Sequence, residues 1–435
     1  MKPIDRQILQ IALPSIISNI TVPLLGLIDV AIVGHLGSPA YIGAIAVGGM
    51  LFNIIYWIFG FLRMGTSGMT SQAYGKRDLP EIVRLLIRSV GIGLAVALCL
   101  ILLQVPIRQA AFLIIHPTEE VREMATLYFH ICIWGAPAML GLYGLSGWYI
   151  GMQNSRIPMY IAIAQNIVNI IASLSLVYFF KMKVEGVALG TLIAQYAGFF
   201  MGLMLWMKHY GKLEKHIVWK EVLQKEAMVR FFQVNRDIFL RTLCLVAVTL
   251  FFTSAGASQG EIILAVNTLL MQLFTLFSYV MDGFAYAGEA LSGRYIGARN
   301  RKAFTDTVRH LFIWGAGLTV LFTLVYASGG NAFLALLTDD RNVITAADTY
   351  FYWALAIPAA GIAAFIWDGI FIGATATRGM LLSMAASAVS FFAVYYGFHT
   401  VLGNHALWLA FLVYLSMRGA MQTLLSRKVM EKSFH

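Results

Sequence analysis

Charged residues and cysteines are both scarce in this chain. Asp, Glu, Lys and Arg make up 12% of the 435 residues and hydrophobic residues 59%, which excludes a water-soluble globular protein. The three cysteines, Cys99, Cys132 and Cys244, are odd in number and lie in apolar segments, so neither a disulfide framework nor a CxxC metal site is expected. The nine histidines lack metal-ligand spacing, and no GxxxxGK[ST] phosphate loop occurs. We therefore expect no bound cofactor, no metal centre and no nucleotide-driven step.

Twelve long apolar segments follow one another along the chain. Each is long enough to cross a bilayer core of about 30 Å, which requires roughly 20 helical residues. Because the segments are continuous and do not alternate between polar and apolar positions, transmembrane strands are excluded. The sequence therefore predicts an all-α integral membrane protein that contacts the lipid bilayer along most of its length. The predicted helices are centred near Val22, Phe52, Val96, Trp134, Ile167, Gly198, Leu245, Phe274, Thr319, Ile357, Ser390 and Leu412.

The net charge of +10 follows membrane topology and does not indicate a nucleic-acid partner. Most of the 31 Lys and Arg residues fall at the two termini and on the loops that follow the even-numbered helices. Cytoplasmic loops carry such an excess of basic residues, so we expect both termini in the cytoplasm. The opposite loops hold only Arg108, Arg122, Lys181, Lys183 and Arg341.

One long charged segment, KHYGKLEKHIVWKEVLQKE, divides the chain almost in half. It is basic and amphipathic, which is typical of a linker that lies along a membrane surface. The sequence thus predicts an N-lobe with helices 1–6 over residues 1–207, a cytoplasmic linker over residues 208–228, and a C-lobe with helices 7–12 over residues 229–435.

The two lobes resemble each other under a shift of 222 positions. Gly34 falls on Gly256, and GWYIGMQNSR from Gly147 falls on GIFIGATATR from Gly369, so duplication is favoured over chance similarity. Because each lobe has an even number of helices, both lobes enter the membrane with the same orientation. Two such pseudo-symmetric six-helix bundles suit alternating access, in which the bundles rock around a central site.

Few acidic residues lie inside the predicted helices, and Asp29 in the first helix is isolated. An ionised side chain in mid-membrane costs about 3 kcal/mol on insertion scales, and no basic residue lies within two turns of Asp29 on its own helix. The carboxyl group is therefore expected to take up and release a proton near neutral pH, as a coupling site requires. The alternative is a structural role, with Asp29 held by hydroxyl or amide donors of a neighbouring helix. Pro14 and Pro23 remove backbone hydrogen bonds from the same helix and would let it bend.

The second lobe carries a different group of charges. Asp282 and Glu289 are two helical turns apart and share one face of the eighth helix. Asp368 in the tenth helix and Arg241 in the seventh are expected to join them in a charge network. Three acids against one Arg leave negative charge that could hold protons, Na⁺ or a cationic substrate. A self-satisfied network that locks the bundle is the alternative.

Several motifs occur in order over nearly the whole chain. They are ALPSI, LIDVAIVGHLG, GWYIGMQNSRIP, NIVNIIASLSLV, NRDIFLRT, AVNTLLMQ and DGFAYAGEALSGRYIGA. Together they resemble the multidrug and toxic compound extrusion (MATE) family, and more specifically its DinF-like bacterial branch. The resemblance implies a twelve-helix antiporter of the bacterial cytoplasmic membrane that exports cationic or amphiphilic organic compounds in exchange for H⁺ or Na⁺. A monomer is the default for this architecture.

The resemblance also assigns residues to an ion-coupling site in the N-lobe. It implies Asp29 as the coupling carboxylate, a helix bend near Pro14, and Asn169 and Thr191 as polar residues of the same site. This chain departs from many relatives at Ser173, which stands where they have a carboxylate. A dehydrated Na⁺ at Asp29 is then less favoured, because hard cations depend on charged oxygen ligands. Proton coupling through Asp29 becomes the favoured hypothesis.

Two other functions remain open from the sequence. A lipid-linked oligosaccharide or lipid II flippase of the same superfamily would need a strongly cationic cleft. The cations within predicted helices are only Arg63, Arg241 and Arg418, and we expect Arg63 and Arg418 to reach the cytoplasmic interface.

An intramembrane enzyme is the second alternative. Its paired Asp residues would need to be in contact, and neither a GxGD-type loop nor a nucleophile and base pair occurs in the sequence.

Overall fold

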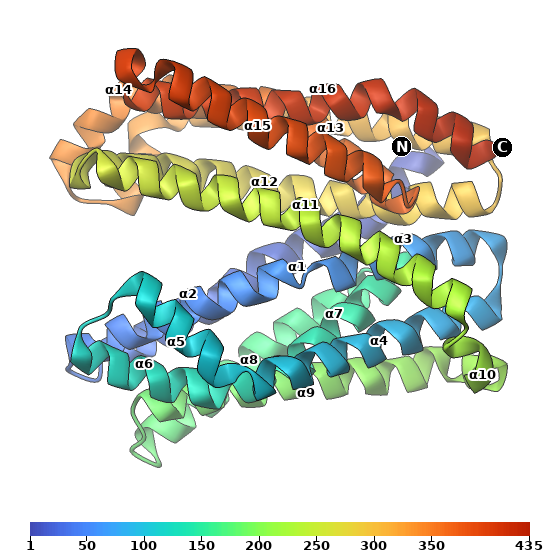
Figure 1. Ribbon diagram of the computed structural model, residues 1–435, viewed down its shortest axis with the longest axis horizontal. Coiled ribbons are helices and arrows are strands. Elements are labelled where there is room, and N and C mark those ends of the chain that lie inside the picture. Colours follow the sequence, from blue (N-terminus) through green and yellow to red (C-terminus); the bar gives the residue numbers. More distant parts are fainter. The chain divides into compact units, whose positions relative to one another are not determined.

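The computed structural model describes all residues, 1–435, and every regular element in it is a helix, so the all-α prediction is confirmed (Figure 1). The first half contains α1 (Pro3–Gly34), α2 (Pro39–Ile58), α3 (Phe61–Lys76), α4 (Leu79–Leu102), α5 (Gln104–Ile115), α6 (Glu119–Cys132), the 3₁₀ helix η1 (Ile133–Gly135), α7 (Ala136–Gly151), α8 (Arg156–Tyr178) and α9 (Val184–Tyr210). The linker forms the 3₁₀ helix η2 (Gly211–His216) and α10 (Trp219–Val222). The second half contains α11 (Lys225–Ser258), α12 (Glu261–Gly297), α13 (Arg301–Leu337), α14 (Arg341–Gly373), α15 (Thr377–Leu402) and α16 (Asn404–Phe434).

Eleven helical segments are long and apolar enough to cross a membrane. Three of them consist of helices that follow one another: α2 with α3, α6 with η1 and α7, and α9 with η2. The twelfth predicted segment, centred near Leu412, is α16, which has 31 residues. Polar residues such as Arg418 and Gln422 make α16 less apolar than the other eleven, although both side chains are buried.

Contacts between residues divide the chain into two compact units. We call Ile17–Phe231 the N-unit, and Met1–Ile16 together with Phe232–His435 the C-unit. Each unit has an apolar core of its own, which includes Phe129 in the N-unit and Trp408 in the C-unit. The boundaries fall inside α1 and α11, so each of these two helices belongs to both units.

Backbone features repeat between the two halves at the shift of 222 residues that the sequence indicated. The helix α1 begins at Pro3 and α11 begins at Lys225. Left-handed backbone conformations also recur, because Arg77 has φ 57° and its counterpart Arg299 has φ 58°. The two halves are therefore copies of one six-span unit, as the repeat predicts.

Close helix contacts occur at corresponding glycines. A Cβ atom at Gly147 of α7 would collide with the Arg63 carbonyl of α3, and one at Gly369 of α14 would collide with the Ala285 carbonyl of α12. Small residues let membrane helices approach at backbone distance, which favours van der Waals packing. In each half the fifth and sixth spans also pack along each other, α8 on α9 and α15 on α16 (Figure 1).

Candidate functional site

A buried carboxylate in the N-unit receives hydrogen bonds from two other helices. Asp29 of α1 is 3% exposed. The Asn169 Nδ2 of α8 donates to its Oδ1 at 3.1 Å, and the Thr191 Oγ1 of α9 donates to its Oδ2 at 2.8 Å. Both donors are uncharged. The hydrogen bonds favour the ionised carboxylate while burial opposes it, so the balance can tip on a change of environment.

Ser173 belongs to the same cluster without touching Asp29. It lies one helical turn beyond Asn169 in α8, and its Oγ donates to the Asn169 Oδ1 at 3.2 Å. Because the amide oxygen of Asn169 accepts from Ser173, the amide nitrogen is left to face Asp29. Ser173 therefore orients Asn169. The helix α9 can approach α8 closely because Gly190 has no side chain. A Cβ atom at this position would collide with the Ser173 Oγ.

The oxygen atoms around Asp29 form a weak set of ligands for a bare cation. Asp29 supplies the single carboxylate, and the other candidate oxygens belong to neutral side chains. No group of three or more His, Cys, Asp or Glu side chains in the protein is arranged to hold a metal ion. Hard cations depend on charged oxygen ligands, and Asp29 is the one charged ligand in this set.

The two prolines of α1 lie on either side of the boundary between the units. Pro14 precedes the boundary at Ile16, and Pro23 lies between that boundary and Asp29. The helix continues from Pro3 to Gly34 without interruption. A proline removes one backbone N–H donor from a helix, so α1 has two places where bending requires less energy.

The C-unit holds an ion-paired carboxylate. The Asp368 Oδ2 of α14 accepts from the Arg241 Nη2 of α11 at 2.6 Å and from the Arg418 Nη2 of α16 at 2.5 Å. Its Oδ1 accepts from the Gln422 Nε2 at 2.7 Å. Exposed fractions are 8% for Asp368, 7% for Arg241 and 5% for Arg418, so the cluster is shielded from solvent.

Arg418 and Gln422 are the members of this cluster that sequence reasoning missed. The expectation that Arg418 reaches the cytoplasmic interface is wrong, because the side chain is buried against Asp368. Tyr414, Arg418 and Gln422 follow one another at intervals of four residues in α16, and this polar stripe in an apolar helix is a signal that could have identified them. Two guanidinium groups, and not one, therefore bind the Asp368 carboxylate.

The other two acids of the C-unit lie on α12. Glu289 is 1% exposed and Asp282 is half-buried. The ion pairs of the cluster join Asp368 to Arg241, as expected, and to Arg418. A buried carboxylate that is paired in this way fits the self-satisfied network among the two alternatives.

The position in the C-unit that corresponds to the Asp29 cluster is aromatic. Under the shift of 222, Asp29 corresponds to Phe251, Asn169 to Phe391 and Ser173 to Tyr395. The Phe251 ring contacts the other two, with centroid distances of 5.9 Å to Phe391 and 5.1 Å to Tyr395. The duplicated fold thus carries a polar cluster in one unit and an aromatic cluster in the other.

Helices that are long and apolar enough to cross a membrane, with a buried carboxylate cluster among them, are typical of a membrane transporter. The family model described as MatE matches residues 14–174 and 238–396. The chain belongs to this family, whose members are efflux transporters of multidrug and toxic compounds and not enzymes. It is a multi-pass membrane protein, and transporters of this family handle small organic substrates.

Several known proteins are similar to this chain. DNA damage-inducible protein F of Escherichia coli K12 is 39% identical over 418 residues, which span 95% of this chain and 90% of that protein. The multidrug export protein MepA of Staphylococcus aureus MSSA476 is 20% identical over 342 residues, 79% of this chain and 75% of that protein. A crystal structure of MATE in the bent conformation has a TM-score of 0.89 at 17% identity, and covers 99% of this chain and 96% of that one. The Vibrio cholerae MATE transporter VcmN in the bent form has a TM-score of 0.86 at 18% identity, over 99% and 98% of the two chains.

Proposed function

We propose that this protein exports cationic or amphiphilic organic compounds across the bacterial cytoplasmic membrane in exchange for protons, by alternating access between two lobes. The observation that carries the proposal is the Asp29 cluster. A single buried carboxylate with two neutral donors, Asn169 and Thr191, can be neutralised by one proton without leaving a buried charge behind. Loss of the charge would weaken both hydrogen bonds, because a neutral carboxyl group accepts less strongly than a carboxylate, and would loosen α1 from α8 and α9.

Protons are favoured over Na⁺ by the ligand set. Ser173 contributes a hydroxyl that is already engaged with Asn169, and no second carboxylate faces Asp29. A proton needs only the carboxylate itself, whereas Na⁺ would have to replace its hydration shell with several oxygens. Na⁺ remains the less favoured coupling ion in this proposal.

The membrane setting follows from charge distribution and from the relatives. The excess of Lys and Arg on one set of loops supports cytoplasmic termini. Bacterial relatives support the cytoplasmic membrane, and one of them is named as a multidrug export protein. We expect the protein to work as a monomer, because each lobe has a core of its own and one chain supplies both lobes.

A lipid-linked oligosaccharide or lipid II flippase is the second candidate, since two buried arginines could serve an anionic cargo. Arg241 and Arg418 are the groups concerned. Both guanidinium groups bind the same carboxylate oxygen of Asp368, which lowers their capacity to attract a phosphate. Antiport of organic cations is therefore the better supported function.

The test is transport of ethidium, a fluorescent organic cation, by the purified protein in proteoliposomes. A proton gradient and a Na⁺ gradient are imposed separately on wild type, Asp29→Asn and the control Asp339→Asn, which makes the same change in an exposed loop. We expect proton-driven transport in wild type and the control, and background transport in Asp29→Asn. Wild-type activity in Asp29→Asn would remove Asp29 from the mechanism, and transport driven only by Na⁺ would overturn proton coupling. No transport under either gradient would favour the flippase.

A further inference from the structure

The first helix of each repeat begins in the unit formed by the other repeat. Residues of α1 up to Ile16 belong to the C-unit, and the rest of the helix belongs to the N-unit. Residues of α11 up to Phe231 belong to the N-unit, and the rest belongs to the C-unit. Any motion between the units must therefore be absorbed inside these two helices.

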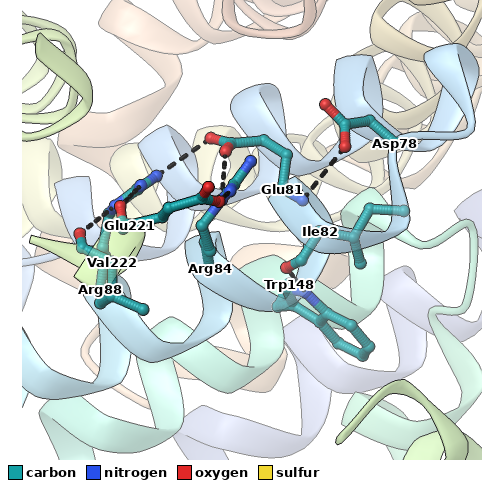
Figure 2. Close-up of polar contacts among 8 residues, drawn as sticks. All are labelled: Asp78, Glu81, Ile82, Arg84, Arg88, Trp148, Glu221 and Val222. Atoms are coloured by element: carbon teal, nitrogen blue, oxygen red, sulfur yellow. Dashed lines mark hydrogen bonds and ion pairs between the residues drawn. The ribbon is translucent and has the colours of Figure 1, made fainter. Parts of the chain in front are cut away.

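A buried arginine fixes the segment that leads into α11. Arg88 of α4 is 4% exposed, and its Nε donates to the Val222 carbonyl at 2.7 Å while its Nη2 donates to the Glu221 carbonyl at 3.0 Å (Figure 2). These carbonyls lie at the C-terminal end of α10, where a helix favours a cation. The Arg88 Nη1 also pairs with Glu81 at 3.0 Å. We call this group the linker anchor.

Neighbouring contacts strengthen the linker anchor. Arg84 pairs with Glu81 at 3.0 Å through its Nε and contacts the Glu221 carboxylate through its Nη1 (Figure 2). The Trp148 Nε1 of α7 donates to the Ile82 carbonyl at 2.8 Å, so α4 itself is held within the N-unit at the same level. The linker is therefore attached to a fixed helix.

A second anchor holds the beginning of α1 in the C-unit. The Asp5 Oδ1 is 2.8 Å from the His310 Nδ1 and 3.1 Å from the Trp314 Nε1, both on α13. Because a carboxylate only accepts, both ring nitrogens donate. The Tyr295 hydroxyl of α12 also donates to the Gln7 Oε1 at 2.5 Å. We call Asp5, His310 and Trp314 the N-terminal anchor.

The two anchors use corresponding positions of the repeat. His310 lies 222 residues after Arg88. Arg88 binds α10, the short helix just before α11, and His310 binds the first turn of α1, so corresponding places on α4 and α13 hold the chain near the start of the first helix of a repeat. The chemistry differs, since a guanidinium binds carbonyls in one anchor and an imidazole binds a carboxylate in the other. Arg88 and His310 occupy the same position of the repeat and both hold a neighbouring segment, although their side chains differ. This correspondence indicates that the two residues have the same mechanical role.

We infer that Arg88 and His310 are positioning residues for the transport cycle. By holding the segment just before α11 and the first turn of α1, they make each of these helices a lever between the two units. The lever α1 carries Asp29 beyond its boundary at Ile16, so it links the C-unit to the coupling carboxylate. This inference rests on the proposed antiport, in which Asp29 drives the change between states.

Transport by Arg88→Met, His310→Phe and the double variant tests the inference. Proton-driven accumulation of ethidium is compared with its gradient-free exchange across the same proteoliposomes. We expect the ratio of accumulation to exchange to fall about tenfold in the double variant, within the range of measured coupling energies. The control Arg427→Gln, which breaks an exposed ion pair on α16, should keep the wild-type ratio. An unchanged ratio in the double variant overturns the inference.

A covalent link that replaces the linker anchor distinguishes a positioning role of Arg88 from a role in protein stability alone. Arg84→Cys and Glu221→Cys are added to Arg88→Met in a background without the three native cysteines. A short bis-maleimide that joins the new cysteines should restore the coupling ratio at least about fivefold, again within the range of coupling energies. If both anchor variants lose accumulation and the joined protein does not recover, the anchors only stabilise the fold and the inference is wrong.

Hydrogen exchange decides the inference even if wild type fails to transport ethidium, a result that would overturn the antiport proposal alone. In His310→Phe we expect faster exchange in residues 17–29 of α1, which lie outside the C-unit. If α1 transmits motion from the C-unit to Asp29, loss of the N-terminal anchor must change exchange in this distant part of the helix. Faster exchange confined to residues 2–16 would contradict the lever, because it would show that the N-terminal anchor acts only where it binds.

Discussion

Asp29 and Asp368 are the same type of residue in opposite surroundings. Asp29 accepts hydrogen bonds from a neutral amide and a neutral hydroxyl, whereas Asp368 accepts from two guanidinium groups and an amide. A carboxylate between two cations stays charged, and protonating it would leave both cations unpaired. This contrast supports the proposal that Asp29 gains and loses a proton, whereas Asp368 holds α11, α14 and α16 together.

The structural role of Asp368 can be measured as a loss of stability. Asp368→Asn leaves Arg241 and Arg418 buried without their carboxylate, and breaking a buried pair in this way costs about 3–5 kcal/mol. We expect a large drop in the unfolding midpoint of the protein in detergent. Adding Arg418→Met should recover part of the loss, because it removes one unpaired charge. A normal midpoint in Asp368→Asn with abolished transport would instead make Asp368 part of the mechanism.

At the scale of elements, glycine contacts set the distance between helices. Gly147 brings α7 against α3, and Gly369 brings α14 against α12 at the corresponding place of the repeat. The backbone carbonyls of Arg63 and Ala285 occupy the space that a Cβ would need. Backbone atoms cannot move aside as a flexible side chain can, so these two positions tolerate no other residue without a shift of a whole helix.

The variant Gly369→Ala should separate α14 from α12. Forcing an extra methyl group into a packed contact costs about 1–3 kcal/mol, so we expect a lower unfolding midpoint and reduced expression. Gly317→Ala in α13 is the matched control, because its Cβ would meet nothing within 4 Å. Since Ala favours a helix by about 1 kcal/mol over Gly, the control should be neutral or slightly stabilising. Equal midpoints for the two variants would contradict the packing argument.

At the scale of the whole molecule, the fold is duplicated, and the first helix of each repeat begins in the unit formed by the other repeat. Each repeat supplies six spans, yet the contacts assign Met1–Ile16 to the unit of the second repeat. The chain therefore passes from one unit to the other inside a continuous helix at both crossings, in α1 and in α11.

The orientation of the chain can be tested by labelling from one side of the membrane. A single cysteine is placed by Ser433→Cys near the C-terminus, or by Asp339→Cys in the loop between α13 and α14, in a background without native cysteines. The charge distribution predicts that a membrane-impermeant maleimide labels position 339 from outside and position 433 only in inverted vesicles. The reverse pattern would refute cytoplasmic termini.

The sequence determined the class of protein, its all-α architecture and the repeat. These features depend on the length of apolar segments and on spacing along the chain, which require no knowledge of distances in space. The isolation of Asp29 was also visible, because neighbours on one helix follow directly from the sequence. Asn169 and Thr191 were named only through resemblance to a family, since nothing in their local sequence connects them with Asp29.

The tertiary structure alone decided which residues meet. The partners of Asp29 are 140 and 162 positions away, and Arg418 lies 50 positions from Asp368. Sequence reasoning placed Arg418 at the interface because a long basic side chain near a helix end often reaches water. Helix packing instead turned it inward, where a buried carboxylate compensates its charge. The assignment of the first 16 residues to the C-unit likewise depends on packing between distant segments, which determines where α1 and α11 can bend.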